Sequence, residues 1–202
     1  MAKPTERPLY PFKESPSQTA GPYVHIGLTP NYCGIEGVFA QDLGTTMIND
    51  TTEGERIVLE GRVIDGGGNP LKDALVEIWQ ADADGQYRSR AEAGFFGWGR
   101  SPADAETGVF RFETIKPGRV PFPDGRLQAP HINVWIVARG INLGLNTRIY
   151  FEDEAEANAG DPVLGRIEHR DRVPTLVAKG GGGTYSHDIH LQGPQETVFF
   201  DI

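Results

Sequence analysis

Residues 128–152 read QAPHINVWIVARGINLGLNTRIYFE, and this stretch decides the fold. Between positions 131 and 137, aliphatic side chains alternate with polar or aromatic ones, which is the period of a strand with one buried face. A His-x-His pair on such a strand places both imidazoles on one face, where they can bind one metal ion. Here His131 is followed two positions later by Asn133, whose neutral amide oxygen is a poor ligand for a transition metal. The stretch therefore has the pattern of a metal-binding strand with half of its ligands missing.

The rest of the composition favours one all-β domain. A chain of 202 residues can bury about 70% of its unfolded surface in a single core. Its 26 glycines and 15 prolines fall between short runs with strand character, which is typical of a two-sheet β-sandwich with many turns and short helices. We predict the sandwich over residues 57–202. Residues 1–56 are polar and proline-rich, and we predict an extended N-terminal arm there.

The sandwich is expected to begin with a hairpin. Strands are predicted at Ile57–Val63 and Ala74–Gln80, on either side of the turn sequence DGGGNP at 65–70. Further alternation predicts other strands, and acidic or proline starts predict two short helices. The expected strands are Val109–Ile115, Ile132–Ala138, Arg148–Phe151 and two around Ile189 and Phe199; the expected helices are Asp153–Asn158 and Pro162–His169.

Charge and cysteine content exclude several classes of function. The net charge of −9 makes nucleic acid an unsuitable partner. The single cysteine, Cys33, cannot form an internal disulfide, which suits a reducing cytoplasm. The first eight residues lack the apolar run of a signal peptide, and no apolar stretch approaches the length of a membrane span. We therefore expect a cytoplasmic protein with no membrane segment.

Three motifs carry a family resemblance. They are EIWQA at 77–81, TIKPG at 114–118 and the stretch from 128 to 150. With them, the chain from residue 16 to residue 200 resembles the intradiol ring-cleavage dioxygenases. The resemblance implies a β-sandwich and an Fe(III)-dependent, O2-consuming cleavage of an aromatic ring between two hydroxyl-bearing carbons.

The chain departs from the family at the iron ligands. Val120 stands where the resemblance places a ligand tyrosine, Asn133 where it places the second histidine, and Gln128 where it places an arginine. The interval 82–100, which would hold the other ligand tyrosine, is shortened. Its tyrosine, Tyr87, matches a family tyrosine that is not a ligand.

Of the four expected protein ligands, His131 alone is kept. We expect it to be hydrogen-bonded in the interior, and we assign neither a metal ligand nor a catalytic residue to this chain. The resemblance is to the chain without iron in the two-chain members of the family. It implies a β chain that binds the Fe(III), a small aromatic acid and O2 as substrates, and a higher-order αβ oligomer.

The resemblance also implies substrate-binding residues in the arm. The stretch PSQTAGPYV at 16–24 matches family sequence beside the iron site of the partner chain, so that Thr19, Gly21, Pro22 and Tyr23 would line the substrate pocket. The residues themselves allow a second interpretation. Gly21 and Pro22 favour a turn, which Tyr23 would pack against the sandwich.

Arg139 is the candidate for binding the substrate carboxylate. An Arg-Gly pair at a strand end is commonly solvent-facing. The resemblance instead places this arginine at the mouth of the active site, where a permanently charged guanidinium can bind a carboxylate through two hydrogen bonds. It would also offset the negative charge of the chain where an anionic substrate enters.

Two alternatives remain open on the sequence. One is a self-sufficient intradiol dioxygenase with rearranged ligands, against which Val120, Asn133 and the shortened interval 82–100 stand. The other is a non-enzymatic β-sandwich binding module that kept the fold and lost the chemistry.

Overall fold

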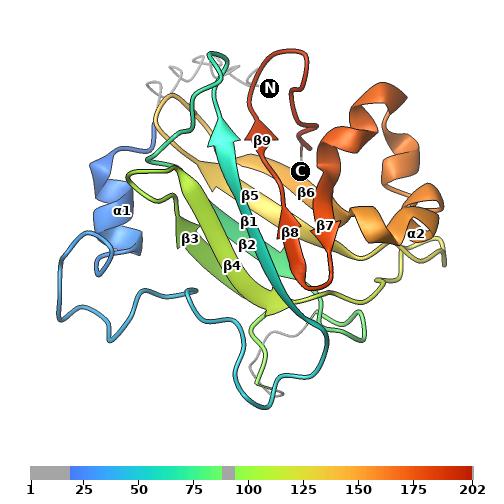
Figure 1. The fold of residues 1–202 in the computed structure, drawn as a ribbon, viewed down its shortest axis with the longest axis horizontal. Helices are drawn as coiled ribbons and strands as arrows, with labels where there is room; N and C mark the ends of the chain where they lie inside the picture. The colour runs from blue at the N-terminus through green and yellow to red at the C-terminus, as the bar shows by residue number, and fades with distance from the viewer. Residues whose placement is uncertain (1–18, 88–93, 202) are drawn as a thin grey trace, which may run out of the picture.

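The computed structural model describes residues 19–87 and 94–201, and its main feature is a sandwich of β-strands (Figure 1). Within these ranges the chain forms nine strands, which confirms the predicted all-β class. The strands are β1 Arg56–Ile64, β2 Leu75–Gln80, β3 Trp98–Pro102, β4 Val109–Ile115, β5 His131–Val137, β6 Leu145–Phe151, β7 Val177–Gly181, β8 Thr184–Ser186 and β9 Ile189–His190.

The two layers of the sandwich are joined along one edge. One layer has the order β3-β2-β5-β6, with all neighbours antiparallel, and the other contains β8, β1 and β4. Strand β7 pairs in parallel with β6 and antiparallel with β8. The backbone ladder therefore runs from one layer into the other through β7.

The core lies between the layers, and the alternation of the sequence explains it. On β5 the side chains of Ile132, Val134 and Ile136 are buried, while the residues between them face outward. From the opposite layer, Leu59 of β1 and Phe110 of β4 are buried in the same cluster. Burying one face of each strand supplies the main driving force for this fold.

The predicted hairpin is wrong. β1 pairs with β4, β8 and β9, whereas β2 pairs with β3 and β5 in the other layer. The turn between them does form, because the Asp65 carboxylate accepts the N–H groups of Gly67 and Asn69, both at 2.8 Å. After the turn the chain crosses the core. Two strands that face each other across a core have the same alternation as two paired strands, so periodicity cannot distinguish these cases.

Helices are short and lie at opposite sides of the sandwich (Figure 1). Helix α1 spans Pro22–Leu28 and α2 spans Ala155–Ala159, the latter preceded by a 3₁₀ turn, η1, at Glu152–Glu154. The helix expected at 162–169 is reduced to the 3₁₀ turn η2 at Leu164–Arg166, followed by η3 at Arg170–Leu176. The strand expected around Phe199 is a single bridge between Phe200 and Asn146. Strand β3 was not predicted.

The segment before β1 is attached to the sandwich by turns. Met47 is almost fully buried, and its carbonyl accepts the N–H of Phe96 at 2.9 Å. The Asp42 carboxylate accepts the N–H groups of Asn31 and Tyr32, both at 2.8 Å, and closes a loop. Residues 1–18 of the predicted arm lie outside the described residues, and the boundary at 56/57 remains a prediction. None of the helices described here has the length and apolar character that crossing a membrane requires.

A buried histidine makes the stability of this fold dependent on pH. His187 is 5% exposed, and burial lowers its pKa from 6.5 to about 4. The unfolded chain binds a proton on this residue near pH 6.5, and the folded chain does so near pH 4. Between these values the unfolded state holds more protons, so this contribution to stability is complete above pH 6.5 and falls with decreasing pH.

We expect His187 to account for a loss of about 2 kcal/mol of unfolding free energy between pH 7 and pH 5. Urea unfolding curves of the wild type and of His187→Gln at both pH values measure the difference. The variant should be less stable at pH 7 and should lose less stability on acidification. Parallel pH dependences in the two proteins would show that His187 does not carry the effect.

Candidate functional site

The outer face of β5 is where the sequence places the remains of a metal site. His131 is 1% exposed, and its Nδ1–H donates to the carbonyl of Ala129 at 2.8 Å. Its Nε2 therefore has a free lone pair, which faces the hydroxyl of Tyr87 at 3.4 Å. The amide Nδ2 of Asn133 donates to the same hydroxyl at 2.9 Å. A phenol oxygen thus lies where a metal held by positions 131 and 133 would lie.

Arg148 supplies the positive charge beside this cluster. It comes from β6, and its Nη1 donates to Gln128 Oε1 at 2.8 Å and to the hydroxyl of Tyr150 at 3.4 Å. Gln128 stands where the family resemblance places an arginine. The guanidinium that is missing at position 128 is therefore present nearby, on the neighbouring strand.

Burial keeps the cluster in its uncharged form, and at His131 the charge of Arg148 acts in the same direction. Burial, with a smaller contribution from Arg148, lowers the pKa of His131 to about 4, so the imidazole is neutral at pH 7. Burial raises the pKa of the Tyr87 hydroxyl above its usual 10. The tyrosine is therefore a phenol and not a phenolate at neutral pH.

These residues do not fit an Fe(III) site. The family resemblance implies that Fe(III) is bound by tyrosinates and a histidine pair, whereas position 120 is an aliphatic valine and position 133 is an amide. His131 faces a neutral hydroxyl. Among residues 19–87 and 94–201, no three His, Cys, Asp or Glu side chains are grouped so that they could hold a metal ion.

The predicted substrate-binding residues meet at the other end of β5. The Thr19 hydroxyl accepts the N–H of Gly140 at 2.8 Å and donates to the carbonyl of Ala138 at 3.5 Å. Thr19 thus bonds both neighbours of Arg139. The Arg139 side chain is 77% exposed, and its Nε is 3.8 Å from a carboxylate oxygen of Asp73. The arm and the arginine, 120 residues apart in sequence, form one corner of the molecule.

Gly21, Pro22 and Tyr23 begin helix α1 at this corner. Gly21 is the residue before the helix, and its carbonyl accepts the N–H of Val24 at 3.0 Å, while Pro22 is the first helical residue. Tyr23 is 86% exposed, so the interpretation that it packs a turn against the sandwich is wrong. His25 fixes the helix instead, through a 2.9 Å hydrogen bond between its Nε2 and the carbonyl of Asp73.

The His131 cluster and the corner formed by Thr19 and Arg139 are far apart. His131 begins β5, and Arg139 follows the end of that strand, so eight residues of nearly extended chain, roughly 25 Å, separate them. The predicted substrate-binding residues therefore do not share a pocket with the His131 cluster.

A pocket of about 360 Å³ lies on the outer face of the β3-β2-β5-β6 layer, next to the His131 cluster. Sequence reasoning missed it, although tryptophans at outward-facing positions of β2, β3 and β5 were a usable indication. Its side-chain lining includes Glu77, Trp79, Trp98, Asn133, Trp135, Asn146, Arg148, Val163 and Phe200.

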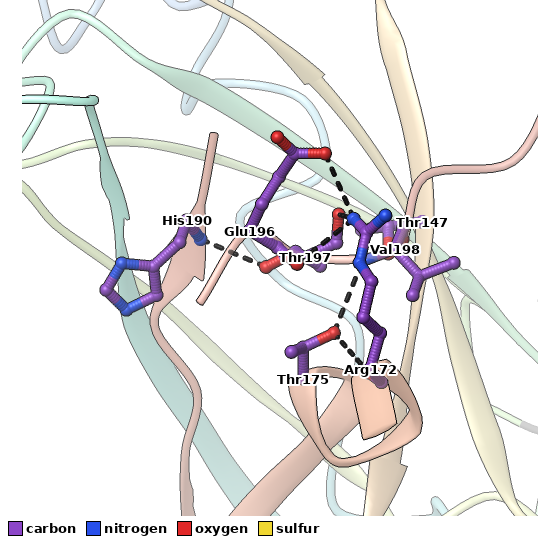
Figure 2. Close-up of polar contacts among 7 residues, drawn as sticks. All are labelled: Thr147, Arg172, Thr175, His190, Glu196, Thr197 and Val198. Atoms are coloured by element: carbon purple, nitrogen blue, oxygen red, sulfur yellow. Dashed lines mark hydrogen bonds and ion pairs between the residues drawn. The ribbon is translucent and has the colours of Figure 1, made fainter. Parts of the chain in front are cut away.

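The C-terminal segment brings Phe200 to this pocket. A polar network around Arg172 holds the residues before it in place (Figure 2). The guanidinium of Arg172, from η3, donates to the carbonyls of Glu196 and Thr197 at 3.2 and 3.1 Å and forms an ion pair with the Glu196 carboxylate at 3.0 Å. Thr147 of β6 donates to the carbonyl of residue 198 at 2.7 Å. The segment is thereby held along β6 up to the Phe200–Asn146 bridge.

Comparison with known proteins decides the family. The family model described as Dioxygenase matches residues 28–193. The protocatechuate 3,4-dioxygenase alpha chain of Pseudomonas putida is 44% identical, over 96% of this chain and 100% of that protein. The chain belongs to the intradiol dioxygenase family.

Two further comparisons agree with this family. The protocatechuate 3,4-dioxygenase beta chain of Burkholderia cepacia is 34% identical over 95% of this chain and 85% of that protein. The solved structure of an intradiol ring-cleavage dioxygenase from Tetranychus urticae has a TM-score of 0.55, with 21% identity over 76% of this chain and 89% of that chain. That likeness supports the sandwich fold. The family resemblance expected from the sequence motifs is confirmed by the family model and by the P. putida alpha chain.

Proposed function

We propose that this chain is the α subunit of a protocatechuate 3,4-dioxygenase, the subunit that does not hold iron. The reaction is the O2-dependent cleavage of protocatechuate between its two hydroxyl-bearing carbons, giving 3-carboxy-cis,cis-muconate. Similarity to an α chain over that chain's full length supports the proposal. So does the neutral hydrogen-bonded cluster of His131, Tyr87 and Asn133, which does not fit Fe(III).

The observation that carries the proposal is the corner formed by Thr19 and Arg139. Thr19 bonds the backbone on both sides of Arg139, so the arm and the arginine would act as one unit. The guanidinium is exposed, and an exposed cation on a chain of net charge −9 is well placed to attract an aromatic acid. In this proposal Arg139 binds the substrate carboxylate, and Thr19, Gly21, Pro22 and Tyr23 form a wall of the pocket.

The partner in this proposal is a β chain that binds the Fe(III). Similarity of this one chain to both an α and a β chain supports related subunits that pair in a heteromer. The exposed face of Tyr23 at the arm corner fits a contact with such a partner. Larger αβ assemblies and a cytoplasmic location belong to the same proposal.

Co-expression tests the proposal. We expect the chain alone to be colourless, iron-free and inactive, and the complex with a candidate β chain to be red, iron-containing and active in protocatechuate-dependent O2 uptake. Iron content, visible absorbance and O2 consumption are measured on both preparations. Colour and turnover from the chain alone would establish the self-sufficient dioxygenase. A colourless, inert complex would favour the binding module.

A further inference from the structure

The walls of the pocket on the outer face of the sandwich are aromatic. Trp79, Trp98 and Trp135 are the three tryptophans of the whole chain, and all of them line it. The Trp79 ring stacks on Tyr87 with an interplanar angle of 5° and remains 40% exposed on the pocket side of the strand layer. Phe200, from the C-terminal segment, also lines the pocket. These flat walls suit an aromatic ring.

Arg148 lines this pocket and carries a positive charge that is not paired with a carboxylate. Within residues 19–87 and 94–201, no carboxylate lies within ion-pair distance of it, and its guanidinium donates to the neutral groups of Gln128 and Tyr150. Asp161 is linked to it through the Tyr150 hydroxyl, and its oxygens already accept three backbone N–H groups. A partly buried guanidinium without a carboxylate favours an anionic ligand.

Glu77 is the one acidic side chain among the lining residues described, and its charge is compensated. Its Oε1 accepts from Arg100 at 2.6 Å, and its Oε2 accepts from the indole N–H of Trp98 at 3.3 Å. The Arg100 guanidinium also lies 4.9 Å from the Trp98 ring centre. Because Glu77 is paired, the charge that a ligand would meet in the pocket is that of Arg148.

We propose that this pocket binds a small aromatic carboxylate on this chain itself, with Arg148 pairing with the carboxylate and the tryptophans holding the ring. A volume of about 360 Å³ lies at the small end of ligand pockets, which suits a single substituted ring. Asn133 and Asn146 at the lining add neutral hydrogen-bonding groups for ring substituents. The site needs neither iron nor the Arg139 corner, so it stands independently of the proposed function.

The test is a titration of the full-length chain with benzoate, followed by tryptophan fluorescence. Since every tryptophan of the chain lines the pocket, a saturable change reports on this place. Benzamide has the same shape without the charge, and we expect it to bind roughly 10- to 100-fold more weakly. Arg148→Gln is expected to weaken benzoate binding by a similar factor. Arg62→Gln, at an exposed position of β1 outside the pocket lining, is the matched control and should bind as the wild type does.

Several outcomes would overturn the proposal. They are the absence of saturable binding, equal affinity for benzoate and benzamide, or unchanged benzoate binding in a folded Arg148→Gln. If that variant fails to fold, the comparison of benzoate with benzamide on the wild type still decides. When the variant does fold, calorimetry on the complex with a β chain must show a benzoate site that Arg148→Gln removes while turnover persists. Its loss on complex formation would mean that the partner chain covers the pocket, and would also overturn the proposal.

Discussion

Replacing Arg139 by glutamine, in the complex with a β chain, is expected to raise the KM for protocatechuate about 100-fold. The exposed guanidinium would lose its carboxylate contact, and a charge-assisted pair of hydrogen bonds is the strongest polar contact that this corner can offer. Because the carboxylate is remote from the bond that breaks, kcat should change much less. Steady-state O2 uptake at varied protocatechuate concentration measures both parameters.

Two comparisons make this result specific to the carboxylate. Catechol lacks that group, so wild type and Arg139→Gln should turn it over with the same kcat/KM. Arg111→Gln removes another exposed arginine, on β4, and serves as the charge-matched control that should leave the KM unaltered. If the Arg139 variant instead retained the wild-type KM for protocatechuate, the carboxylate would be bound elsewhere, and the role given to this corner would be wrong.

A large loss of stability is expected from Gly61→Ala in β1. A Cβ at this position would lie 1.8 Å from the carbonyl oxygen of His187 and 2.9 Å from Cζ of Phe110. The carbonyl belongs to the backbone beside β8, so it cannot rotate away as a flexible side chain could. We expect the free energy of unfolding to fall by about 3 kcal/mol, measured by urea denaturation at pH 7.

Gly27→Ala in α1 is the matched control for this substitution. An ideal Cβ there meets nothing within 4 Å, and alanine is the better helix former. A change of about zero or a slight gain in stability is therefore expected. Equal effects of the two substitutions would mean that the close approach of β1 to residue 187 does not constrain the fold.

The sequence predicts a strand correctly where the alternation of buried and exposed side chains within that strand is enough to identify it. The alternation at 109–115 and at 131–137 matches β4 and β5 within one residue. It fails where the partner has to be known. Both β1 and β2 alternate, yet whether they pair or face each other depends on the whole core. Strand β3, WGRSP, contains a glycine and a proline and has no clear alternation, so tertiary pairing with β2 decides it.

The candidate site, too, could be predicted from the sequence only in part. The losses at Val120 and Asn133 are visible in the sequence, but the residue that fills the place of the metal is not. Tyr87 reaches it from a loop 44 positions away, and Arg148 compensates the missing arginine from a neighbouring strand. Neither contact has a local pattern, because each depends on the register between elements distant in sequence. The role of Arg139 and the arm remains a prediction of the family resemblance.

The pairing of β1 has a consequence for biosynthesis. This first strand finds its hydrogen-bonded neighbours in β4, β8 and β9, so its ladder includes residues as late as His190. Contacts between the beginning and the end of a chain carry a large loop-closure cost and slow folding. While the ribosome still holds the C-terminal segment, one side of β1 is an open strand edge on an apolar sheet, which is prone to aggregation. We therefore expect chaperones that bind the nascent chain to reduce its aggregation until β8 and β9 can pair with β1.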